Sequence, residues 1–225
     1  MSADFKTITD RDNNSINRKI ILYSPLIIIV INITTAIIAG KIVGKWAFIP
    51  IILIEWVLFA YFIFLQKDPK EIKKWLKKSI RKYSWIWIGL TIFIGLLPLP
   101  IFIKYYYLLY DITVFLPWII LALVNPFLEE FYWRGVLLDQ TKNWMPIISV
   151  LYSSLLFSAN HAVFGINSEL FRGSEVLIST LIMGIIWAIT YKRTNSLRWV
   201  IISHFLVDFL NLSSAAFLDL YKAGH

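Results

Sequence analysis

The sequence contains no cysteine, which excludes disulfides, cysteine nucleophiles and thiolate metal ligands. It has only three histidines, and the pattern His-Glu-x-x-His that is typical of many zinc proteases does not occur. No Gly-x-Ser-Gly lies in an apolar segment, so a serine nucleophile within the membrane is not indicated. No stretch rich in Pro, Gly and Ser divides the chain. We therefore predict that residues 1–225 form a single domain.

The composition is that of a membrane protein. Hydrophobic residues make up 58% of the chain, which includes ten Trp, and the mean hydropathy is +0.68. Soluble domains contain about 45–50% apolar residues. The net charge of +8 does not indicate a nucleic-acid partner, because the basic residues cluster beside apolar runs, as expected for contact with anionic lipid. The polar N-terminus lacks the features of a cleaved signal peptide.

Seven segments are long and apolar enough to cross a bilayer as helices, which takes about 20 residues each. We therefore predict an all-α fold, a polytopic transmembrane bundle of about seven helices. The predicted spans are Ile20–Ala39, Trp46–Leu65, Trp85–Ile103, Asp111–Leu138, Met145–Phe164, Ser174–Tyr191 and Leu197–Leu218. The fourth span exceeds the thickness of a bilayer, so we expect it to tilt, kink or project from the membrane.

Lysine and arginine are concentrated in loops on one side of this seven-span arrangement, which predicts a cytoplasmic N-terminus and an external C-terminus. The segment 67–82 combines many lysines with apolar residues at helical spacing. It predicts an amphipathic helix on the cytoplasmic leaflet, in contact with anionic lipid. The expected location is a bacterial plasma membrane.

Two adjacent glutamates, Glu129 and Glu130, follow an apolar run in the fourth span. A charged side chain near the bilayer centre costs about 2.5–3.5 kcal/mol, so each requires an explanation. Glu130 is four residues before Arg134, which predicts an ion pair on one helix face with a structural role. Glu129 has Trp133 at the same spacing and is left without a partner. Pro126 predicts a kink or opening just before the glutamates.

Further polar residues lie in the last spans. His161 ends the fifth span with Phe157 on the same face, and His204 shares a face of the seventh span with Asp208. Because none of these groups can face lipid cheaply, we expect Glu129, His161, His204 and Asp208 to converge on one pocket.

Such a pocket contains the groups needed for hydrolysis. A carboxylate beside an imidazole can take a proton from water, and a second His–Asp pair can stabilise an oxyanion. Glu129, His161 and His204 are also ligand types that bind a divalent metal such as zinc. The residues alone leave both mechanisms open. Glu55 in the second span is a further intramembrane acid of unassigned role, for which Asn32 is a candidate partner.

The motifs "EEFYWR", "FSANH" and "HFLVD" resemble those of the CPBP family, which comprises CAAX prenyl proteases and bacteriocin-processing proteins of the Abi type. The resemblance covers the region from Asn125 to Asn211, and we expect the catalytic core in residues 111–211. It implies an intramembrane endopeptidase in which Glu129 and His161 activate water, and His204 and Asp208 bind the oxyanion or a metal. Glu130 and Arg134 would brace the site. The CAAX-processing members have Asn where this chain has Asp208.

The leading hypothesis is therefore hydrolysis of a membrane-associated peptide or protein, metal-assisted or not. A non-catalytic bacteriocin-immunity or peptide-binding protein is an alternative from another class. A proton-coupled transporter is a third, although no inverted repeat is visible in the sequence.

Overall fold

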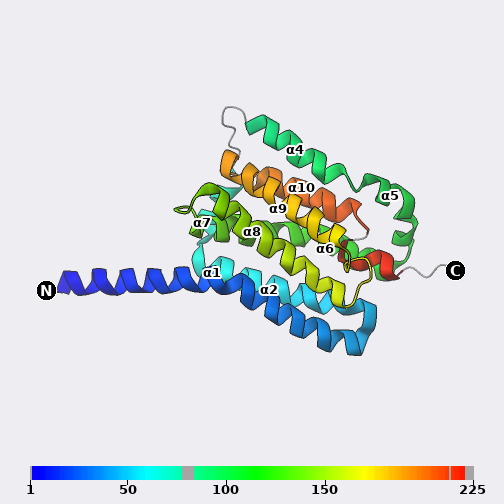
Figure 1. Ribbon diagram of the computed structural model, residues 1–225, viewed down its shortest axis with the longest axis horizontal. Coiled ribbons are helices and arrows are strands. Elements are labelled where there is room, and N and C mark those ends of the chain that lie inside the picture. Colours follow the sequence, from blue (N-terminus) through cyan, green and yellow to red (C-terminus); the bar gives the residue numbers. More distant parts are fainter. Residues whose placement is uncertain (1, 78–83, 213, 221–225) are drawn as a thin grey trace.

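The computed structural model describes residues 2–77, 84–212 and 214–220, with side chains from residue 18 onward except for 214–216. Helices make up nearly all of these residues, and no strand occurs among them. Figure 1 shows the main helices running along the length of one bundle. The predicted all-α bundle is therefore confirmed.

Short turns connect the helices. The α-helices in the described residues are α1 (Ser2–Val43), α2 (Phe48–Gln66), α3 (Pro69–Trp75), α4 (Ser84–Leu96), α5 (Leu99–Tyr105), α6 (Ile112–Glu130), α7 (Leu138–Gln140), α8 (Pro146–Ala162), α9 (Ser174–Thr194) and α10 (Arg198–Leu210). The 3-10 helices are η1 (Gly44–Ala47), η2 (Tyr106–Tyr110), η4 (Val163–Ile166) and η5 (Ser214–Leu220), and η3 (Phe131–Leu137) is a π-helix.

Five stretches of the described chain are long and apolar enough to cross a membrane. The first, Arg18–Gln66, contains two predicted spans, because the chain folds back after α1 and returns as α2 (Figure 1). Gly44 makes this turn possible with a φ of +56°, a conformation that costs glycine little. The five stretches thus contain six of the seven predicted spans.

The last predicted span differs from the structure. Helix α10 has 13 residues and ends at Leu210, well before the predicted Leu218. At about 1.5 Å per residue it is shorter than the roughly 30 Å hydrocarbon core. It packs against α4 and α6 within the bundle. The chain after Leu210 leaves the α-helix and forms η5.

The fourth predicted span is irregular, but at a different place than expected. Helix α6 continues through Pro126 to Glu130, and the π-helix η3 begins at the next residue. The opening therefore follows the two glutamates, whereas Pro126 was expected to open the helix before them. Six consecutive residues, 132–137, are buried here, including large aromatic side chains. A wider π turn provides room for consecutive buried side chains, and such turns are frequent at functional sites.

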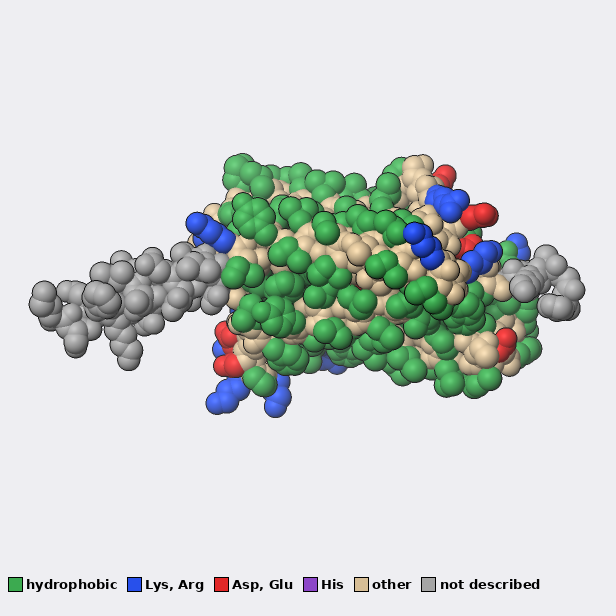
Figure 2. Space-filling view, turned by 90° about the horizontal axis from the view of Figure 1, so that it is seen from below, with side chains coloured by type: hydrophobic (Ala, Val, Ile, Leu, Met, Phe, Trp, Pro, Cys, Tyr) green, Lys and Arg blue, Asp and Glu red, His purple; other side chains and the backbone are tan. Residues whose placement is uncertain are grey.

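The surface of the bundle is that of an integral membrane protein. Figure 2 shows hydrophobic side chains covering the middle of one face, while the basic and acidic side chains gather towards the two ends. Large apolar side chains such as Val57, Phe64 and Trp85 are 65–69% exposed. Contiguous apolar surface of this kind is unfavourable in water and favourable in lipid.

The predicted basic amphipathic helix is present in part as α3, and the region 78–83 lies outside the described residues. Asp68 caps α3 by accepting a hydrogen bond of 2.8 Å from the Glu71 backbone N–H. The aromatic ring of Trp75 is buried in the protein, where it lies against Phe131 and over Gly135. This apolar side of α3 thus packs on the bundle rather than on lipid.

Helices α4 and α10 approach closely at Gly95, and this contact provides a test of the packing. A Cβ atom at Gly95 would lie 2.9 Å from the backbone oxygen of Ser203, whereas a Cβ at Gly89 in the same helix meets nothing within 4 Å. We expect Gly95→Ala to destabilise the protein by about 1–3 kcal/mol, because a backbone atom cannot move aside locally.

Gly89→Ala is the matched control. It should be neutral or stabilising by up to about 1 kcal/mol, because alanine has the higher helix propensity. Unfolding of both variants in detergent measures the difference, and equal stabilities would contradict the close approach of the two helices.

Candidate active site

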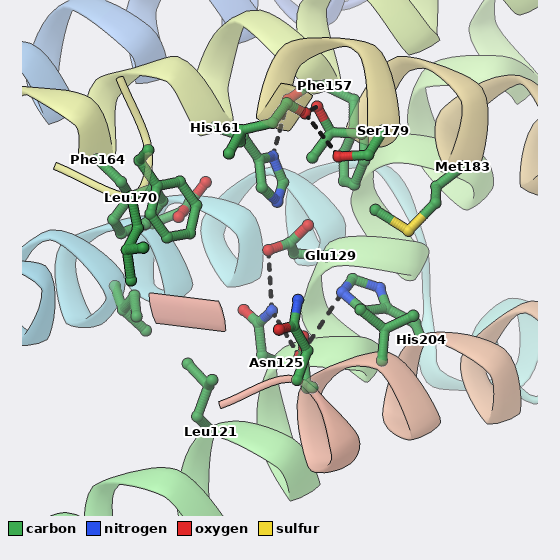
Figure 3. A pocket seen from close by; sticks show the side chains of 18 of the residues that line it. Leu121, Asn125, Glu129, Phe157, His161, Phe164, Leu170, Ser179, Met183 and His204 are labelled. Carbon is green, nitrogen blue, oxygen red and sulfur yellow. Dashed lines mark hydrogen bonds and ion pairs between the residues drawn. The ribbon is translucent and has the colours of Figure 1, made fainter. Parts of the chain in front are cut away.

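A cavity of about 310 Å³ lies inside the bundle between α2, α6, α8, α9 and α10. Its walls include Glu129, His161, His204 and Asp208, the four residues expected to converge. Figure 3 shows Glu129 between His161 on one side and His204 on the other. Three helices therefore bring these side chains together. Both histidines line the same cavity.

Glu129 lies near the end of α6 and is 4% exposed. Its Oε1 atom accepts a hydrogen bond of 2.9 Å from Nδ2 of Asn125. Its Oε2 atom is buried and has no hydrogen-bond partner. One carboxylate oxygen is therefore fixed by a hydrogen bond, while the other is buried without a partner. An unsatisfied buried carboxylate oxygen is costly, and such atoms are concentrated at functional sites.

Asn125 is a site residue that the sequence analysis missed. Its Nδ2 donates to Glu129 and also to Oδ2 of Asp208 at 3.1 Å, and its Oδ1 accepts from the Trp56 indole N–H at 2.8 Å. The Asn125 amide thus fixes the Glu129 carboxylate of α6 and the Asp208 carboxylate of α10 relative to each other. The available signal was its position four residues before Glu129, which places both side chains on one face of the helix.

The predicted pair of Glu130 and Arg134 forms, with Nη1 of Arg134 2.9 Å from Oε1 of Glu130 and both side chains fully buried. The same oxygen is 2.8 Å from Nδ1 of His204. The Arg134 guanidinium carbon lies 4.2 Å from the ring centre of Phe157 and 5.2 Å from that of Trp187. Two aromatic faces therefore cover the cation where it has no further hydrogen-bond acceptor.

His161 occupies the last turn of α8, where its ring lies 4.4 Å from that of Phe157. Its Nδ1 is 2.9 Å from the backbone oxygen of Phe157. A carbonyl oxygen can only accept, so Nδ1 is the protonated nitrogen, and in the neutral ring Nε2 has the free lone pair. The ring extends towards Glu129 in Figure 3.

His204 is held between two carboxylates. Nδ1 faces Glu130, and Nε2 lies 3.6 Å from Oδ2 of Asp208, four residues further along α10. The ring stacks on Trp187 with 4.7 Å between the ring centres. Because the Glu130 carboxylate paired with Arg134 can only accept, Nδ1 of His204 donates to it. Nε2 is the nitrogen directed towards Asp208 and the cavity.

Glu55 also lines the cavity, and its partner differs from the one considered from the sequence. Its Oε1 accepts a hydrogen bond from Nδ2 of Asn160, and Oδ1 of Asn160 accepts from Nδ2 of Asn32 at 3.0 Å. Asn160 therefore connects α1, α2 and the last turn of α8. Asn32 reaches Glu55 only through this bridge. Asn160 directly precedes His161, and no sequence motif identified it.

The arrangement of donors does not fit a metal ion. In the described part of the chain no three His, Asp or Glu side chains are placed together so as to hold one. Zinc sites require at least three converging protein ligands. We therefore derive no chemical step through a metal.

The fold and the cavity define a class: an integral membrane protein of helices with a buried carboxylate–imidazole site. Residues 109–210 match a family model described as "Type II CAAX prenyl endopeptidase Rce1-like". Residues 109–210 are therefore similar to the Rce1-like family of CAAX proteases, and the resemblance inferred from the three motifs is confirmed. No curated protein and no solved structure matched the chain.

The Glu130–Arg134 contact predicts a large difference between two neighbouring substitutions. Glu130→Gln removes the negative charge and leaves a buried guanidinium uncompensated, so we expect a loss of about 3–5 kcal/mol of stability. Glu129→Gln should be far milder, because its side-chain oxygen still accepts from Asn125. Thermal unfolding in detergent compares the two variants. Equal losses would show that the Glu130 carboxylate is not the counter-charge of Arg134.

Proposed function

We propose that the protein is an intramembrane endopeptidase that hydrolyses a peptide bond of a membrane-associated peptide or protein. The observation that supports this most is the free Oε2 of Glu129 in a cavity that His161, His204 and Asp208 also line. The family match supports the same class of reaction.

In this proposal Glu129 and His161 activate water. The unpartnered Oε2 of Glu129 takes a proton from the water, and the oxygen of the water attacks the scissile carbonyl carbon. Nε2 of His161 has the free lone pair in the neutral ring and accepts the second hydrogen of the water, which orients it. Oε1 of Glu129 and Nδ1 of His161 each form a hydrogen bond within the protein, so the positions of both side chains are set before the substrate binds.

His204 is the proposed donor to the oxyanion. The Glu130 carboxylate holds Nδ1, and Asp208 faces Nε2, so the imidazole is fixed between two acceptors. When the ring is protonated on both nitrogens, the N–H at Nε2 can donate to the oxygen that becomes negative in the tetrahedral intermediate. Asp208, as a carboxylate, cannot donate and is assigned the role of orienting His204.

Glu130 and Arg134 support the site without touching the reaction. Their ion pair fixes the acceptor for His204, and the aromatic rings of Phe157 and Trp187 fix the guanidinium. The remaining cavity walls are largely apolar, with Leu121, Phe164 and Met183 among them. This lining suits the apolar residues of a peptide held at the membrane, with or without a prenyl group.

Glu129→Gln tests the central assignment. We expect kcat to fall by about 10²–10⁴-fold, the range attributed to a positioned general base, while the fold is retained. The substrates are internally quenched peptides with a C-terminal CAAX sequence, S-farnesylated or unmodified, incubated with the purified protein in liposomes. Full activity of Glu129→Gln would refute the role of this residue. Peptide binding by a wild-type protein that cleaves nothing would instead indicate the non-catalytic binder.

Asp208 offers a second test, because the CAAX-processing members of the family that the chain resembles have asparagine at this position. Asp208→Asn should retain cleavage, since the amide oxygen still faces Nε2 of His204 and its N–H can also donate to the oxyanion. Asp208→Ala should lower kcat by up to about 100-fold, because no side chain at this position then orients His204. Steady-state kinetics with the same peptides compares the two, and an inactive Asp208→Asn beside an active Asp208→Ala would contradict this arrangement.

A further inference from the structure

Glu55 is an acid in the cavity that the mechanism above does not use. It belongs to α2, outside the segment that matches the family, and it is 1% exposed. Its side chain lines the same cavity as Glu129. Helices α2 and α6 pack against each other, so two carboxyl groups from adjacent helices line one cavity.

The hydrogen-bond partner of Glu55 is a neutral amide. Its Oε1 accepts from the Asn160 amide, whose own oxygen accepts from Asn32, so the Asn160 N–H₂ group is the one that faces Glu55. No lysine, arginine or histidine in the described residues forms an ion pair with it. A buried carboxylate without a cation is strongly disfavoured, so the acid retains its proton.

Glu129 has different neighbours. It lies between His161 and His204, which line the same cavity. Glu129 is thus beside two imidazoles, whereas Glu55 has a neutral amide as its hydrogen-bond partner. Two carboxyl groups in unlike environments are the arrangement that acid–base hydrolysis requires.

We propose that Glu55 is the general acid that protonates the leaving amine, an inference that rests on the proposed endopeptidase function. Glu129 takes one proton from the attacking water, and the C–N bond breaks as Glu55 gives its proton to the amine nitrogen. The products are a carboxylic acid and an amine. The proton on Glu129 then passes through cavity water to Glu55, which restores both groups.

The test compares two leaving groups in the same peptide. An amide nitrogen must be protonated as it leaves, whereas a phenolate leaves without a proton. In Glu55→Gln, the side-chain oxygen still accepts from Asn160 but no proton can be donated. We expect kcat for the peptide amide to fall by about 100-fold or more, the lower range for a general acid, while hydrolysis of the corresponding phenolic ester stays close to wild type.

Asn160→Ala provides the structural control, since it removes the hydrogen bond to Glu55 without changing the acid. If Glu55 serves only to hold α8, Asn160→Ala slows both substrates and Glu55→Gln slows neither. Equal losses for amide and ester in Glu55→Gln, or no loss at all, would overturn the proposal.

Glu55→Asp is the second variant, and it covers the case in which glutamine impairs folding. It retains an acid and should hydrolyse the amide faster than Glu55→Gln, or at a measurable rate where Glu55→Gln does not fold. An inactive Glu55→Asp with intact ester hydrolysis agrees with misplacement of the acid, while loss of both activities counts against the proposal. A wild-type protein that cleaves neither amide nor ester would instead refute the proposed function itself.

Discussion

A single carboxylate oxygen, Oε1 of Glu130, connects most of the site. It accepts from Arg134 at 2.9 Å and from His204 at 2.8 Å, and thereby joins the α6–η3 segment to α10. Arg134 in turn lies under aromatic rings of α8 and α9. In a bundle surrounded by lipid, no water compensates a buried charge, so the cation and anion must be neutralised within the protein. The positions of four elements follow from this pairing.

The pairing also explains how Glu129 differs from its neighbour. Adjacent residues on a helix diverge by about 100°, so only one of the two glutamates can face Arg134. Glu129 is directed into the cavity, where a neutral amide from Asn125 holds one oxygen and leaves the other unpaired. Glu130 contacts Arg134 and His204, and Glu129 is the acid that lines the cavity. Two identical residues side by side thus have separate environments because of the geometry of the helix.

Contacts within one helix were predictable from spacing, and contacts between helices were not. The Glu130–Arg134 pair and the shared face of His204 and Asp208 follow from four-residue intervals. Asn125 was overlooked although it precedes Glu129 by the same interval, because an amide next to a proline resembles an ordinary helix irregularity. The bond from Glu130 to His204 depends on how α6 and α10 are packed, which no local pattern encodes.

The positions of irregular backbone in the helices also differ from the prediction. Proline predicted an opening at Pro126, yet the helix accommodates it and widens only at Phe131. The cause lies in side-chain volume, because residues 132–137 are all buried and a regular turn cannot direct all of them into the bundle equally well. Similarly, hydropathy extended the last span to Leu218, whereas α10 ends at Leu210. Apolar composition measures the preference for lipid but does not define where hydrogen bonding of the helix stops.

The cavity extends beyond the segment that the family model matches. Residues 109–210 provide the four site residues expected from the motifs, and Glu55 of α2 provides a further polar side chain in the wall. Trp56 of α2 donates to the amide that positions Glu129 and Asp208. Its neighbour Glu55 adds an acid, and Asn32 of α1 fixes the orientation of Asn160, which contacts that acid. Since buried polar groups are retained only where they are satisfied or used, this convergence on α2 is best understood as part of the site. Helix α2 therefore contributes Ile52 and Glu55 to the wall of the cavity, and Glu55 is a further carboxyl group there.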